Sequence, residues 1–158
     1  MYAFVGGVGF NVKDVDKMGA YLYPNQYVEF TEDSELAKET AKICEGKTAS
    51  EKFHAIRNYI ERYFRYDFIR TLLVKNGELP NAEKCFKEKT GICQDLASMA
   101  AAMLRSQGIP ARFVIGHADK NYHAWVIAYI DGQPIRLDPT ALVRGITKQM
   151  RYTEERYC

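Results

Sequence analysis

Apolar residues recur at helical spacing through the middle of the chain. Between residues 48 and 67 they fall at three- and four-residue steps, so one side of a helix is apolar. The stretch 95–107 repeats this pattern and adds small residues on its other sides, which is typical of a buried helix. Gly108 marks its end and Pro110 prevents continuation. The apolar positions of the two stretches are Phe53, Ile56, Ile60, Tyr63 and Phe64, and Leu96, Met99, Ala100, Met103 and Leu104.

Two shorter helices are expected before and after the helix at 48–67. Thr31 or Ser34 can cap a helix that runs to about residue 45, and the acidic residues that follow favour its positive end. A short helical turn fits residues 81–87. Residues 70–80 predict a loop, because turn-forming and helix-breaking residues end this segment.

The pattern changes after Pro110. Runs rich in β-branched and aromatic residues cover 112–115, 122–130 and 135–137, and a fourth strand is expected near 151–157. Asp131-Gly132 is a hairpin-turn signal between the second and third runs. Helices followed by a meander of strands indicate an α+β fold rather than alternating α/β units.

Composition indicates one domain with an N-terminal extension. The chain has 158 residues, of which 47% are apolar, and this is enough to build a core. Residues 1–30 are rich in glycine and aromatic residues without helical periodicity, so we expect an extension that lies over a domain at 31–158. The net charge of +2 implies no polyelectrolyte partner. The sequence contains no run of about 18 apolar residues, so no membrane span is predicted.

Four cysteines leave the cellular compartment open. Cys44, Cys85, Cys93 and Cys158 are too few and too far apart for a disulfide scaffold, and their pairing cannot be deduced from spacing. Residues 1–10 lack the basic start of a secretory signal. An extracellular or cell-surface location follows if a signal has been removed, and a cytoplasmic one follows otherwise.

Cys93 is the first candidate for chemistry. It lies just before the buried helix, where backbone N–H groups and the helix dipole favour a reactive thiolate. Gly91, two residues earlier, leaves room for a substrate to approach. The alternative is a buried structural cysteine, which is a common role for a free thiol.

His123 and Asp138 complete a possible catalytic set. A thiolate nucleophile needs a base, and His123 opens the second strand; a carboxylate on the next strand can hold the imidazole in one tautomer. A tight turn at Asp131-Gly132 places Trp125 opposite Asp138. Asp138 is then a diagonal neighbour of His123 on the same face, within reach of a hydrogen bond.

The sequence disfavours both zinc and nucleic acid as ligands. Cys85, Cys93, His117 and His123 are zinc-ligand types, but the cysteine spacing does not fit a structural site. The arginines of the helix at 48–67 are interleaved with acidic residues, as on a solvated helix face. No metal and no cofactor are therefore expected.

Five separated blocks resemble the transglutaminase-like superfamily in its bacterial form, over residues 24–158. The resemblance implies a papain-like fold with a Cys–His–Asp triad, whose positions Cys93, His123 and Asp138 take. The blocks are Gly91-x-Cys93-Gln94-Asp95-Leu96-Ala97, LRSQGIPAR from Leu104 to Arg112, Gly116, His123-Ala124-Trp125-Val126 and Leu137-Asp138-Pro139-Thr140, with the upstream elements Tyr23-Pro24-Asn25-Gln26-Tyr27 and Phe64-x-Tyr66-Asp67.

The resemblance implies attack on an amide carbonyl of a peptide or protein through a thioester, with an amine or water as acceptor. A cysteine protease proper and a non-catalytic peptide-binding module of the same fold are the alternatives. The chain has no acidic loop of the calcium-binding kind. An oxyanion hole needs a donor besides the Cys93 N–H, and the oxyanion or cleft candidates are Tyr66, Gln94 and Trp125. Trp125 is expected to be either a wall of the cleft or a core residue.

Overall fold

The computed structural model describes residues 2–5, 8–11 and 18–158. Residues 1, 6–7 and 12–17 of the expected N-terminal extension lie outside the described residues. The helices are η1 (Gly19–Tyr21), α2 (Glu35–Cys44), α3 (Ala49–Tyr63), α4 (Phe68–Leu73), α5 (Ala82–Glu88), α6 (Cys93–Ser106) and α7 (Pro139–Arg144). The strands are β1 (Tyr2–Val5), β2 (Val8–Asn11), β3 (Arg65–Tyr66), β4 (Thr90–Gly91), β5 (Ala111–Ala118), β6 (Asn121–Ile130), β7 (Gln133–Leu137) and β8 (Tyr152–Tyr157).

The main sheet has four antiparallel strands in the order β7-β6-β5-β8. Asp131 and Gly132 both have positive φ, at 52° and 79°, and form the tight turn between β6 and β7. The register pairs Val126 with Leu137, so the next position along places Trp125 opposite Asp138. The expected α+β order, the fourth strand and this register are confirmed.

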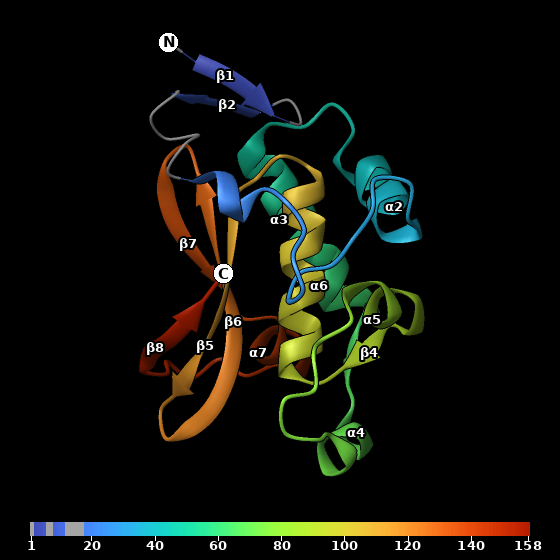
Figure 1. Ribbon diagram of the computed structural model, residues 1–158, viewed down its shortest axis with the longest axis vertical. Coiled ribbons are helices and arrows are strands. Elements are labelled where there is room, and N and C mark those ends of the chain that lie inside the picture. Colours follow the sequence, from blue (N-terminus) through green and yellow to red (C-terminus); the bar gives the residue numbers. More distant parts are fainter. Residues whose placement is uncertain (1, 6–7, 12–17) are drawn as a thin grey trace.

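Helix α6 lies at the centre of the molecule. Figure 1 shows it between the sheet formed by β5–β8 and the helices α2, α3 and α5. Its large apolar side chains are fully buried, as the sequence pattern predicts: Leu96, Met99, Met103 and Leu104. Burial on all sides fixes the helix rigidly, and its first residue therefore has a well-defined position.

The predicted helix caps are found at two starts. Ser34 accepts a hydrogen bond from the Ala37 N–H at the start of α2. Thr48 and Glu51 form a reciprocal capping box at the start of α3, with distances of 3.0 and 3.2 Å. These contacts satisfy backbone donors that a helix start otherwise leaves open.

Two helical segments differ from the sequence prediction. Helix α3 ends at Tyr63 rather than near residue 66, because β3 pairs in parallel with β4 and draws the chain into an extended form. The segment predicted as a loop at 70–80 begins with the last residues of α4, which the Asp67 carboxylate caps. The apolar residues of α4 are exposed and form no buried stripe, so the sequence pattern does not predict this helix. They are Phe68, Ile69, Leu72 and Leu73.

The segment before α2 is packed onto the same core. Val28 and Phe30 belong to the apolar cluster around α6, and Leu22 is buried as well. The buried Arg105 side chain donates to the carbonyl oxygens of Tyr23, Ala111 and Cys158, at 2.7–3.0 Å. Burial lowers the pKa of Arg105 to about 10. One side chain thus joins the N-terminal segment, β5 and the end of β8.

Within residues 2–5, 8–11 and 18–158, no helix combines the length and the apolar character that crossing a bilayer requires.

Candidate active site

Cys93 is the first residue of α6 and is partly exposed, as its sequence position predicts. The Asp95 carboxylate, one turn into the helix, accepts a hydrogen bond from the Ile92 N–H at 3.1 Å. Cys93 lines a cavity of about 550 Å³ that His123 also lines. The structure therefore brings the predicted thiol and imidazole to one cavity.

His123 is bound to Asp138 across the β6–β7 hairpin. The ring Nε2 donates to the Asp138 Oδ2 at 2.8 Å, and both side chains are largely buried. Burial alone would lower the pKa of His123, but hydrogen bonding and charge from Asp138 and from Cys93 raise this pKa to about 9. The imidazole ring is therefore protonated at both nitrogens at neutral pH. Because Nε2 is bound to Asp138, Nδ1 is the nitrogen available to Cys93.

Asp138 has two further partners besides His123. Its Oδ1 accepts from the Ala141 N–H at 3.2 Å and so caps α7, while its Oδ2 accepts from the Tyr152 hydroxyl at 2.8 Å. Burial acts to raise the pKa of Asp138, but the hydrogen bonds and the His123 charge hold this pKa below its ordinary value. Asp138 therefore remains an acceptor well into the acidic range.

Tyr152 is a site residue that the sequence reasoning missed. It lies on β8, and burial together with the neighbouring Asp138 charge raises its pKa, so its hydroxyl keeps the proton that it donates. β8 can approach because Gly116, which lies opposite Glu154 in the register, has no Cβ that would collide with the neighbouring Thr153 carbonyl. The Gly116 block was visible in the sequence, but its role in admitting β8 was not.

Trp125 is a core residue and not part of the cleft wall. Its side chain is 1% exposed, and its ring stacks on His123 with centroids 6.1 Å apart and meets the Tyr152 ring edge-on at 5.0 Å. Because side chains alternate along β6, Trp125 and His123 lie on the same face of the strand, and the Trp125 ring packs against the imidazole. Trp125 is therefore not available as an oxyanion or substrate contact.

Tyr66 and Gln94 both line the 550 Å³ cavity with Cys93. The Tyr66 and Thr71 hydroxyls are hydrogen-bonded at 3.1 Å, and the Thr71 hydroxyl also donates to the Asp67 carbonyl at 3.2 Å. The Gln94 side-chain amide donates to the Glu78 carbonyl at 3.2 Å. Gln94 thus holds the segment 74–80 that forms one side of the cavity.

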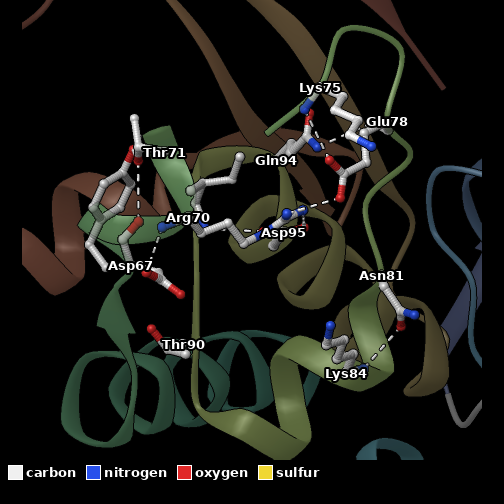
Figure 2. Close-up of polar contacts among 12 residues, drawn as sticks. Asp67, Arg70, Thr71, Lys75, Glu78, Asn81, Lys84, Thr90, Gln94 and Asp95 are labelled. Atoms are coloured by element: carbon white, nitrogen blue, oxygen red, sulfur yellow. Dashed lines mark hydrogen bonds and ion pairs between the residues drawn. The ribbon is translucent and has the colours of Figure 1, made fainter. Parts of the chain in front are cut away.

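A charged cluster fixes the same segment to the start of α6. Figure 2 shows the Arg70 guanidinium between Asp95 and Glu78, with Gln94 and Lys75 beside it. Arg70 donates to the two Asp95 oxygens at 2.7 and 3.2 Å and to Glu78 at 2.9 Å, and these partners raise its pKa. We refer to Arg70, Glu78 and Asp95 as the Arg70 cluster.

Gly91 makes room for protein rather than for substrate. A Cβ at this position would lie 2.7 Å from the Asp95 Cβ and 3.1 Å from the Cys85 sulfur. The expectation that Gly91 admits a substrate is therefore wrong, since the space beside it is filled by the side chains that support the α6 start.

The Arg70 cluster leads to a stability prediction. Asp95 is 4% exposed, so Asp95→Ala removes the acceptor of the Ile92 N–H and leaves the Arg70 charge with Glu78 as its remaining partner. We expect the free energy of unfolding in urea to fall by about 2–4 kcal/mol. Glu39→Ala, which breaks the exposed Glu39–Lys42 pair, is the matched control with an expected loss of at most about 1 kcal/mol. Equal losses in the two variants would show that the cluster is no more than a surface pair.

The remaining thiols differ from Cys93 in their surroundings. All four cysteines are free, and Cys44 and Cys85 are buried. Burial is the main cause that raises the pKa of Cys44, Cys85 and Cys158. Across residues 18–158, no three His, Cys, Asp or Glu side chains are grouped as ligands of a metal ion.

Comparison with known proteins places these residues in a broader family. The family model described as the transglutaminase-like superfamily matches residues 34–139. The uncharacterized protein YebA of Bacillus subtilis is 28% identical over 123 residues, which are 65% of this chain and 16% of YebA. The chain thus spans only a small part of this curated relative.

Solved structures share the fold. A proposed cysteine protease of Cytophaga hutchinsonii has a TM-score of 0.67 and 28% identity, and the match covers 86% of this chain and 45% of that one. The periplasmic domain of TgpA from Pseudomonas aeruginosa (TM-score 0.57, 19% identity, 75% and 47% covered) shows the likeness of fold alone. The same holds for a structure described as a TGase (TM-score 0.59, 18% identity, 87% and 40% covered).

Proposed function

Since this chain belongs to the transglutaminase-like superfamily, we propose that it is a cysteine-dependent amide hydrolase or acyltransferase that acts on peptides or proteins. The observation that carries the proposal is the 2.8 Å bond from His123 to Asp138, with Cys93 beside the ring at the mouth of a cavity. In this proposal Cys93 is the nucleophile, His123 the base and acid, and Asp138 the orienting carboxylate.

The reaction follows from the positions of these groups. The Cys93 thiolate attacks the amide carbon, and the carbonyl oxygen gains the negative charge. His123, protonated because its pKa is raised to about 9, then gives its proton to the departing nitrogen, and the thioester remains on Cys93. His123 next takes a proton from water or from an amine, whose attack releases the acyl group and restores the thiol site.

The negative charge on the carbonyl oxygen needs donors that are already in place. The Cys93 N–H is one of the first N–H groups of α6, which have no acceptor within the helix, and it is the first donor of the proposed oxyanion hole. Tyr66 is the second, because it lines the cavity and its hydroxyl can turn its proton from Thr71 toward a bound oxyanion. Tyr66→Phe is expected to lower kcat by about 10²-fold with little change in KM. An unchanged kcat would remove Tyr66 from the proposal.

Tyr152→Phe tests the support of the orienting carboxylate. Losing a hydrogen bond to a charged acceptor costs about 1.5–3 kcal/mol, so we expect kcat/KM to fall by about 10- to 100-fold while the fold is kept. A purely structural role would lower stability but would leave the pH profile of kcat/KM where it is. The proposal expects the alkaline limb of that profile to move as well.

The thiols give a test that requires no substrate. We expect iodoacetamide to modify Cys93 first at pH 7, because Cys93 is partly exposed beside a protonated imidazole. Cys44, Cys85 and Cys158 should lag, since burial raises the pKa of each. Peptide mapping by mass spectrometry reads out the order. A common rate for all four thiols, or Cys93 as the slowest, contradicts the assignment.

The choice between acyl acceptors is decided by a mass-spectrometric screen. The protein is incubated with glutamine-containing peptides, with and without an added primary amine. A mass gain equal to the amine indicates transfer, conversion of glutamine to glutamate indicates deamidation, and shortened peptides indicate a protease. Shortened peptides are among the outcomes because the Cytophaga hutchinsonii neighbour is a proposed cysteine protease. Peptides that stay unchanged in every arm, or that change equally with Cys93→Ala, contradict the proposal.

A further inference from the structure

A second cavity opens beside the one that holds Cys93 and His123. It measures about 320 Å³ and shares Tyr27, Phe113, Ile115 and Arg156 with the larger cavity. Because these four residues line both spaces, the two cavities adjoin, and we refer to them together as the groove. We call the smaller space the apolar chamber; its lining is completed by Tyr157 and Cys158.

The chamber is lined mostly by apolar and aromatic residues, two of which lie on β5, the strand next to the one that carries His123. Ile115 pairs with Ala124 in the sheet register, directly after His123. The Phe113 ring is 1% exposed and stacks under the Tyr27 ring with centroids 6.0 Å apart. The half-buried Tyr27 ring and Ile115 side chain offer apolar surface to a ligand.

Arg156 brings a positive charge to the junction of the two cavities. Its guanidinium donates to the Tyr122 hydroxyl at 3.0 Å, and among the described residues no carboxylate lies within ion-pair distance of it. Glu78, an acidic residue on the cavity wall, is already bound to Arg70 at 2.9 Å, whereas Lys75 on the same wall has no ion pair within the described part of the chain. The open charge of the groove is therefore positive.

We propose, on the basis of the function proposed above, that the acyl donor is an acidic peptide. A large apolar side chain of this peptide occupies the apolar chamber, and a neighbouring carboxylate pairs with Arg156. The apolar contact supplies affinity and the guanidinium sets the direction in which the peptide lies. Arg156 and Ile115 are then specificity-determining residues of the site.

The test measures binding alone, so it does not depend on turnover. Four dye-labelled hexapeptides, identical except for Leu or Ala at one position and Glu or Lys at the next, are titrated against the Cys93→Ala protein by fluorescence anisotropy. We expect the Leu-Glu peptide to bind about fivefold tighter than the Leu-Lys peptide. Adding Arg156→Glu should reverse this preference, and adding Ile115→Ala should reduce the preference for Leu over Ala by roughly three- to tenfold.

The control separates a local contact from a change in net charge. Arg151→Glu alters the charge equally at an exposed residue that lines neither cavity, and it should leave the Leu-Glu preference in place. Equal effects of Arg151→Glu and Arg156→Glu, or no preference among the four peptides, overturn the acidic-peptide proposal. A binding preference that persists while the glutamine-peptide screen shows no turnover overturns the proposed function instead.

Discussion

Cys93→Ala is expected to abolish amide turnover, with a loss of at least about 10⁴-fold in kcat, because the thioester cannot form without the sulfur. Other groups that stabilise the transition state cannot compensate, because without the sulfur there is no attack on the amide carbon. The measurement is the rate of ammonia or amine release from a peptide identified by the screen. Circular dichroism and thermal unfolding check that the variant keeps its fold.

The matched control for this substitution is Cys44→Ala. Cys44 lies at the end of α2 and lines neither of the two cavities, so the variant should keep its activity even if it loses some stability. Turnover that survives Cys93→Ala, or that falls equally in Cys44→Ala, would show that the chemistry does not depend on Cys93.

Asp138→Asn is expected to lower kcat by about 10³- to 10⁴-fold while the β6–β7 hairpin stays in place. The amide can offer an N–H to the His123 Nε2, which favours the wrong tautomer and removes the negative charge that stabilises the imidazolium. Glu154→Gln, at an exposed carboxylate of β8 that pairs with Arg112, serves as the control and should leave kcat within a factor of about two. A fully active Asp138→Asn protein would reduce Asp138 to the cap of α7.

The same variant has a signature in the pH profile. Hydrogen bonding and charge from Asp138 help to raise the pKa of His123 to about 9, so the wild-type kcat/KM should fall as the pH rises through about 9. In Asp138→Asn this alkaline limb should move to lower pH. A limb that stays at the same pH would show that the proton lost there does not belong to His123.

Protonation of His123 also makes the stability of the fold depend on pH. The pKa of His123 is higher in the folded protein than its ordinary value of 6.5, so the folded state binds the proton more tightly. The stabilisation is complete below about pH 6.5 and is lost as the pH rises through about 9. Urea unfolding of the wild type at pH 6 and pH 9.5 should show this loss, and Asp138→Asn should show less of it.

The sequence predicts those parts of the site that depend on local rules. The apolar stripe of α6 places Cys93 at a helix start, and the symmetry of a tight turn at Asp131-Gly132 places Asp138 diagonally from His123. Both predictions rest on periodicities that hold wherever a helix or hairpin forms. The place of Cys93 at a helix start and the pairing of His123 with Asp138 could therefore be anticipated without tertiary information.

The parts that were missed depend on contacts between distant segments. Tyr152 reaches Asp138 only because β8 pairs with β5 across a register shift beside Gly116, and no local pattern around Tyr152 announces this. Helix α4 has exposed apolar residues and no buried stripe, and the Arg70–Asp95 ion pair joins two elements far apart in the chain. Strand alternation gives the face of Trp125 but not what covers that face, so the sequence leaves a cleft wall and a core position both open for it.

The most direct measurement is the capture of the acyl intermediate. A peptide that the screen identifies is mixed with the protein, the reaction is stopped with acid within its first turnovers, and the protein is analysed by intact mass and peptide mapping. We predict a mass gain equal to the peptide without its leaving amine, located on Cys93, removed by hydroxylamine, and missing in Cys93→Ala. Turnover without any such adduct, or an adduct on another residue, would contradict the assignment of Cys93 as the nucleophile.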